Sequence, residues 1–125
     1  MSDYPAIFID QKRYRIRIYK RTLHMLGDPK FIQLLINPED LLVIVRASDR
    51  SDSMTHRIVW ENFVSKQSYE LTSKQLIQNM QSVCVNWNAG ESYRIFGEIV
   101  HHENIARFDL RNIVPCSNDW GTQDE

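Results

Sequence analysis

In Tyr14-Arg-Ile-Arg-Ile-Tyr19, apolar and basic side chains alternate, so that the isoleucines face one way and the arginines the other. Alternation with a period of two and one apolar face is typical of a half-buried strand. Ser68-Tyr-Glu-Leu-Thr72 is a second short strand candidate. Each is followed by a predicted helix and then by two strands joined through a turn. The plan strand, helix, strand, strand therefore runs twice, in internal units of about 14–60 and 68–113.

The first unit combines a short helix with a hairpin of apolar strands. A helix is predicted over Lys20 to Leu26, because Gly27 can adopt the left-handed conformation that ends a helix. Phe31 to Ile36 and Leu41 to Val45 are the strands, and Asn37-Pro-Glu-Asp40 between them has the residues of a turn. Both strands are apolar at nearly every position. This predicts cover on both faces, by the helices on one side and on the other by a further element, for which another subunit is a candidate.

The second unit has a longer helix, predicted over Ser73 to Cys84, with the Ser73 hydroxyl as its cap and an apolar stripe along one side. Two alternating strands follow, Tyr93 to Val100 and Ile105 to Leu110, with a histidine-containing turn between them. Gly97 marks a bulge or a point of close backbone approach inside the first of these strands.

Together these elements predict one α+β domain over residues 1–125. We expect two helices on one side of a mainly antiparallel sheet of about seven to nine strands. Ala6 to Ile9 and His56 to Trp60 supply further strands. From Val114 onward we expect the chain to fray, which makes 114–125 a tail.

Composition indicates a folded cytoplasmic protein. The apolar and charged fractions, 42% and 25%, lie near the averages for globular domains. The longest apolar run, Leu41 to Val45, is far too short to cross a bilayer. The first residues lack the basic and apolar segments of a signal peptide, so none is expected. Two cysteines, Cys84 and Cys116, are too few for a disulfide scaffold and are expected to be reduced thiols.

Clustered cations are the main functional signal. Arginines on one strand face suit a phosphate backbone, because guanidinium is always charged and binds phosphate through two hydrogen bonds. Tyr19 on the same face could stack on a base. The alternative is a solvent-facing strand whose arginines pair with acids on neighbouring strands. Both predicted helices also lack Asp and Glu, as expected of a surface that faces phosphates. The candidate nucleic-acid-binding residues are Arg13, Arg15, Arg17, Lys20, Arg21 and Lys74.

The sequence has no motif for catalysis, for a cofactor or for a metal. His101 and His102 are adjacent on a turn and cannot easily bind one ion together. Cys84 lies on the apolar stripe of its helix and is expected to be buried and inert. We expect no enzymatic activity. Two functions are favoured: a non-catalytic module that contacts nucleic acid, and a protein-interaction or homo-oligomeric adaptor module without nucleic-acid binding. The third hypothesis, an enzyme or small-ligand binder, requires a pocket that a sequence does not show.

The stretch Ile18-Tyr-Lys-Arg-Thr-Leu-His-Met-Leu-Gly-Asp-Pro-Lys-Phe-Ile-Gln-Leu-Leu-Ile-Asn-Pro-Glu39 resembles a group of short, uncharacterised bacterial proteins. That resemblance implies no activity. Over about residues 14–113, the repeated order of elements is similar to that of one domain of a DNA sliding clamp. In that family the helices line the DNA-facing side of a ring and the sheets form its outside. The resemblance implies a clamp-like fold, nucleic acid as a partner, and self-association to complete a ring.

Overall fold

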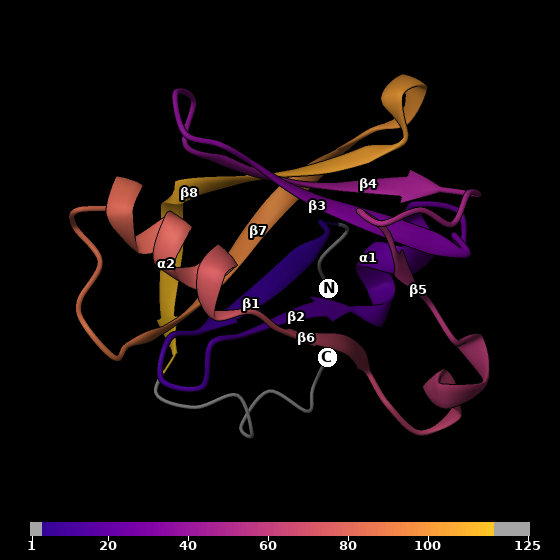
Figure 1. The fold of residues 1–125 in the computed structure, drawn as a ribbon, viewed down its shortest axis with the longest axis horizontal. Coiled ribbons are helices and arrows are strands. Elements are labelled where there is room, and N and C mark those ends of the chain that lie inside the picture. The colour runs from indigo at the N-terminus through magenta and orange to yellow at the C-terminus, as the bar shows by residue number, and fades with distance from the viewer. Residues whose placement is uncertain (1–3, 117–125) are drawn as a thin grey trace.

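The computed structural model describes residues 4–116, which contain eight strands, two α-helices and two short 3₁₀ helices (Figure 1). The strands are β1 (Ala6–Asp10), β2 (Arg15–Tyr19), β3 (Phe31–Asn37), β4 (Leu42–Ser48), β5 (His56–Arg57), β6 (Ser68–Thr72), β7 (Ser92–Val100) and β8 (Ile105–Cys116). The helices are α1 (Lys20–Met25) and α2 (Lys74–Val83), and the 3₁₀ helices are η1 (Trp60–Val64) and η2 (His101–Glu103). Both predicted helices are confirmed.

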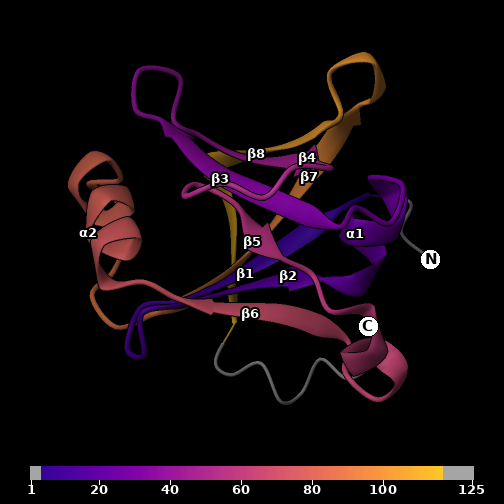
Figure 2. The same cartoon turned by 45° about the vertical axis from the view of Figure 1, so that its right-hand side comes forward.

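All eight strands belong to one antiparallel sheet in the order β5-β3-β4-β8-β7-β1-β2-β6. The sheet curls, so that β3, β4 and β8 lie over β1, β2 and β6 with a shared interior between them (Figure 2). The prediction of an α+β protein with a mainly antiparallel sheet is therefore confirmed. None of the helices in the described part of the chain has the length and apolar character needed to span a bilayer.

The two α-helices lie at opposite ends of the curled sheet (Figures 1 and 2). The register between β2 and β6 explains this arrangement, because Tyr19 pairs with Ser68 and Arg15 pairs with Thr72. The chain enters α1 directly after Tyr19 and enters α2 shortly after Thr72. Since the two strands are antiparallel, the helices must leave the pair from opposite ends.

One apolar core fills the interior of the curl. The inward isoleucines of β1 and β2 contact it, as do Leu23 from α1 and Ile77 and Met80 from α2, and all three helix side chains are fully buried. Both helices therefore cover the same, concave face of the sheet, as the sequence predicts. The alternation predicted for Tyr14 to Tyr19 is confirmed as well, since Ile16 and Ile18 are buried in this core.

Local signals at the helix ends act as predicted. The Ser73 hydroxyl accepts a hydrogen bond from the Leu76 N–H (3.2 Å), which satisfies one of the free donors in the first turn of α2. Gly27 follows α1 with a φ of 84°, in the left-handed region that side chains disfavour.

At Gly97 the backbones of the paired strands β7 and β8 approach closely. The register between these strands shifts between Ile95 and Gly97, which confirms the predicted bulge. A Cβ atom at position 97 would lie 2.0 Å from the Arg107 carbonyl oxygen. Beyond the bulge β8 continues to Cys116, because its last residues pair with the start of β7. The expectation of fraying from Val114 is therefore wrong for 114–116, and the rest of the predicted tail lies outside the described residues.

The strand predicted over His56 to Trp60 is wrong beyond Arg57. Tertiary contacts redirect the chain into η1. The Trp60 indole N–H donates to the Pro29 carbonyl (2.9 Å), and the Trp60 ring stacks on His24 with 5.5 Å between centroids. Phe63, one turn later, is buried in the core. These contacts stabilise a helical turn where sequence pattern alone favours an extended strand.

The hairpin of β3 and β4 buries one face and leaves the other half-buried. Ile32, Val43 and Val45 lie in the core, whereas Leu35 and its cross-strand partner Ile44 are only partly covered. No second layer within residues 4–116 covers that face. Cover by another subunit stays a prediction.

We predict that Gly97→Ala lowers the free energy of unfolding by about 1–3 kcal/mol or more, since the new methyl group must push apart two backbones. Urea unfolding followed by circular dichroism measures the change. Gly27→Ala is the matched control, because a Cβ atom there meets nothing within 4 Å and costs only the left-handed backbone. Equal losses for the two variants would contradict the close-approach explanation.

Candidate functional site

The six predicted cations lie in three separate places. Arg13, Arg15 and Arg17 lie on the outer side of β2 and in the turn before it. Lys20 and Arg21 begin α1, and Lys74 begins α2 at the opposite end of the sheet. The structure therefore brings the three arginines together but does not join the helix cations into one surface.

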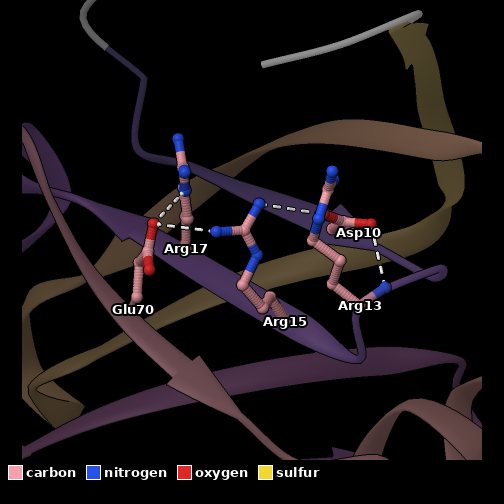
Figure 3. Close-up of polar contacts among 5 residues, drawn as sticks. All are labelled: Asp10, Arg13, Arg15, Arg17 and Glu70. Carbon is pink, nitrogen blue, oxygen red and sulfur yellow. Dashed lines mark hydrogen bonds and ion pairs between the residues drawn. The ribbon is translucent and has the colours of Figure 1, made fainter. Parts of the chain in front are cut away.

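The three arginines form a network with two carboxylates (Figure 3). The Asp10 carboxylate accepts from Arg15 (3.0 Å) and from Arg13 (3.3 Å). The Glu70 carboxylate lies 3.4 Å from the Arg15 guanidinium and 2.6 Å from the Arg17 Nε. Strand register sets these contacts, because Asp10 is paired with Arg15 and Glu70 with Arg17 across their ladders. The guanidinium groups thus meet acids of neighbouring strands, which is the alternative that the sequence leaves open.

Asp10 is the buried centre of the network, with its carboxylate only 5% exposed. Burial by itself raises the pKa of this carboxyl. The hydrogen bonds from Arg15 and from the Arg13 backbone and side chain outweigh burial, and the pKa of Asp10 falls below its ordinary value. Asp10 is therefore ionised at neutral pH.

The helix cations also have partners inside the molecule. The Lys20 ammonium donates to the Phe63 carbonyl (2.7 Å), and the Arg21 guanidinium donates to the Tyr4 carbonyl (3.0 Å). The Lys74 ammonium lies over the ring of Tyr14, 5.7 Å from its centroid. Each contact leaves the charge in place, so binding of a phosphate backbone by these residues stays a prediction.

Tyr19 cannot stack on a base in this structure. Its side chain is 4% exposed and packs with Ala6 and Phe8 in a small cluster on the outer side of the sheet. The Arg94 guanidinium lies over its ring at 5.8 Å. The expectation of an exposed stacking platform at Tyr19 is wrong, because the neighbouring strand β1 places Phe8 beside it.

A different feature emerges at the two ends of the sheet. In residues 4–116, β5 and β6 are the strands that pair on one side only, while every other strand pairs on both. The space between them is a cavity of about 150 Å³, here named the open seam. The open seam is lined by Arg57, Val59, Asn62, Phe63, Lys66, Ser68, Tyr69 and Glu70.

Backbone hydrogen bonds show which edge of β6 is free. The Lys20 N–H donates to the Gln67 carbonyl, and the Ser73 N–H donates to the Tyr14 carbonyl, both at 2.8 Å. Because these groups alternate sides along a strand, the odd-numbered residues of β6 face β2. The N–H and C=O groups of Ser68, Glu70 and Thr72 therefore face away from β2, and of these residues Ser68 and Glu70 line the open seam.

Two uncharged aromatic rings lie on the inner side of the sheet beside the open seam. The rings of His56 and Tyr69 meet there with 6.5 Å between centroids. Burial lowers the pKa of His56 and raises the pKa of Tyr69, so both rings are neutral at pH 7.5. Phe63 also lines the seam and is buried, with 5% of its surface exposed.

A larger groove of about 900 Å³ lies where β7 and β8 meet the β3–β4 turn. Its arginines are already paired: Arg107 with Glu98, and Arg111 with Asp109 through bonds of 2.9 and 3.0 Å. These two arginines are therefore satisfied within the molecule, whereas the outward backbone groups of Ser68 and Glu70 pair with no strand of residues 4–116.

The side chains that could bind a metal are dispersed over residues 4–116. No three His, Cys, Asp or Glu side chains of this range gather closely enough to hold a metal ion. Cys84 is buried, as predicted, and burial raises the pKa of its thiol to about 11, so it stays protonated.

No family model, curated protein or solved structure matches the chain. The functional interpretation therefore rests on the geometry of the residues themselves. Sequence reasoning missed the open seam because its residues come from β5, η1 and β6, and only the strand order brings the two sheet ends together.

We predict that Asp10→Asn lowers the free energy of unfolding at pH 7 by about 1–3 kcal/mol, since it weakens hydrogen bonds to a buried charge. The folded pKa of Asp10 is depressed, so this stabilisation is present above the ordinary carboxyl pKa and is lost as pH falls below about 4. Urea titrations of both proteins from neutral to acidic pH measure the difference.

The difference between wild type and Asp10→Asn should shrink toward zero as pH falls through this range. Asp109→Asn serves as the control, because that carboxylate holds only the neighbouring Arg111 at the surface and should contribute less than about 1 kcal/mol. A wild-type advantage that stays constant down to the most acidic sample would argue against the network.

Proposed function

We propose that the protein is a non-catalytic interaction module that binds an extended segment of a partner protein along the free edge of β6. The observation that carries this proposal is the open seam. There β6 has no strand paired along its outer edge, and Ser68, Glu70 and Thr72 direct backbone donors and acceptors away from β2. Extended peptides commonly bind by adding a strand to such an edge, with backbone bonds for affinity and side-chain contacts for specificity.

We also infer that the two halves of the chain are one unit used twice, β1-β2-α1-β3-β4 and β5-β6-α2-β7-β8. These bounds differ from the units 14–60 and 68–113 expected from sequence, because β1 joins the first unit and β5 the second. In this reading β1, β2, β3 and β4 of the first half correspond to β5, β6, β7 and β8 of the second. The strand pairings support it, because the pair β3 and β4 corresponds to the pair β7 and β8, and the pair β1 and β7 corresponds to the pair β5 and β3. The β1·β2 ladder of the first half has no counterpart between β5 and β6. The open seam is thus the place where a strand pairing present in one half is absent from the other. Strand addition does not require the likeness to a sliding-clamp domain, which stays a prediction.

Magnitudes indicate a modest affinity for backbone pairing alone. Each added hydrogen bond contributes about 0.5–1.5 kcal/mol net, whereas association costs about 4–15 kcal/mol. A short edge therefore needs side-chain contacts as well. Val59, which is 38% exposed, and the half-buried Tyr69 offer apolar surface beside the free edge.

Nucleic-acid binding through the six cations is the competing proposal, and the geometry supports it less. Acids interrupt the arginine face at Asp10 and Glu70 (Figure 3). The helix cations begin α1 and α2, which lie at opposite ends of the curled sheet (Figure 2). A backbone-binding surface needs several cations that can contact successive phosphates together.

We predict that Ser68→Pro abolishes peptide binding without unfolding the protein. Proline removes the outward N–H at position 68, while the bonds to β2 come from odd-numbered residues. Random nine-residue peptides displayed on phage, selected against the wild-type protein, supply the ligands, and fluorescence anisotropy measures the affinities of the recovered peptides.

Those peptides should bind Ser68→Pro at least tenfold more weakly than wild type and bind Ser68→Ala normally, since alanine keeps the N–H. Circular dichroism verifies that both variants fold. Recovered peptides that bind all three proteins equally, or a selection that recovers none, would overturn strand addition at β6.

The nucleic-acid proposal predicts that a fluorescent DNA duplex binds at low salt and is released steeply as salt rises, with about one counterion released for each phosphate neutralised. Arg21→Ser/Lys74→Ser should then weaken binding. We expect no binding at micromolar protein concentration. Tight, salt-sensitive binding that this double variant weakens would favour nucleic acid over a peptide partner.

A further inference from the structure

The open seam carries an excess of positive charge. Arg57 and Lys66 line it, both are exposed, and neither has an ion-pair partner among residues 4–116. The carboxylate of Glu70, which also lines the seam, is already shared by Arg15 and Arg17. A ligand in the seam therefore meets two uncompensated cations.

Register places Arg57 on the outer side of the sheet. Ile32 is buried in the core and pairs with His56, so the next pair, Phe31 with Arg57, points outward. Glu70 also points outward, since it meets the outer arginines of β2. Lys66 lines the same cavity two residues before β6 begins. The inner side of the seam, in contrast, presents the rings of His56 and Tyr69.

We propose that the segment bound in the open seam alternates acidic and apolar residues. This inference rests on the proposed strand addition. Side chains of an added strand point alternately outward and inward, so Asp or Glu at every second position would face Arg57 and Lys66. Aliphatic or aromatic side chains at the positions between would pack on the inward-facing ring of Tyr69. The partner is thus a protein with an exposed, extended acidic segment.

The peptides recovered by phage selection against wild type test this partner chemistry. Their sequences should be enriched in Asp and Glu at alternate positions relative to the unselected library. Arg57→Ser/Lys66→Ser should weaken their binding about twofold to thirtyfold, the range expected for two exposed ion pairs. Added salt should weaken binding to wild type more than binding to this variant.

A second double variant, Lys12→Ser/Arg46→Ser, removes the same charge from residues that do not line the seam and should leave binding unchanged. Peptides that depend on the Ser68 N–H but show no acidic bias, and that bind Arg57→Ser/Lys66→Ser normally, would overturn the acidic partner and leave strand addition intact. Peptides indifferent to Ser68→Pro would overturn both. Sedimentation that shows wild type self-associating and Ser68→Pro monomeric would place a second copy in the seam, and would also overturn the acidic partner.

Discussion

The antiparallel pairing of β2 with β6 is the constraint on which most of the molecule depends. These strands come from different halves of the chain, and their register decides from which end each helix leaves the sheet. The same pairing uses the odd-numbered backbone groups of β6 and leaves its even-numbered groups at the open seam. It also brings Glu70 beside Arg15 and Arg17. Helix placement, the arginine network and the free edge therefore share one cause.

The outer face of β2 and the open seam are both polar surfaces. They differ in how many of their hydrogen-bonding and charged groups have partners within the molecule. The outer arginines of β2 have carboxylates on both neighbouring strands, and the ionised Asp10 is enclosed by its donors. A polyanion would have to compete with those contacts. The open seam has backbone groups that no strand of the described chain meets, beside the two cations Arg57 and Lys66. Unsatisfied groups at an exposed edge are the stronger reason to expect a partner.

Local sequence signals correctly predicted the structural features that depend on residues close together in the chain. The alternation in Tyr14 to Tyr19, the Ser73 cap and the Gly97 bulge each act within a few residues, and each has the structure expected of it. The class of fold followed from the order of such elements. What escaped prediction depends on residues that are distant in sequence. The chain leaves β5 early because Trp60 bonds to Pro29, 31 residues away, and no local pattern records that contact.

The candidate site shows the same division. The sequence singled out the arginines of β2 and left open whether acids on neighbouring strands would pair with them. The structure identifies those acids as Asp10 and Glu70. The sequence could not show that Glu70, 53 residues beyond Arg17, would be one of them, or that Arg57 and Lys66 would face a gap between sheet ends. Strand order is a property of the whole chain, so any site formed between two edges lies beyond what periodicity predicts.

The position of β1 has a consequence for how the protein folds. β1 lies between β2, its immediate neighbour in the chain, and β7, whose residues Ser92 to Phe96 are about eighty-six positions later. Closing such a long loop is entropically costly, and contacts of this span slow folding. During synthesis the β1–β2 hairpin emerges before the other described strands, and the second edge of β1 stays unpaired until β7 has been made. A strand that lies in the interior of the finished sheet is thus an exposed edge until β7 pairs with it.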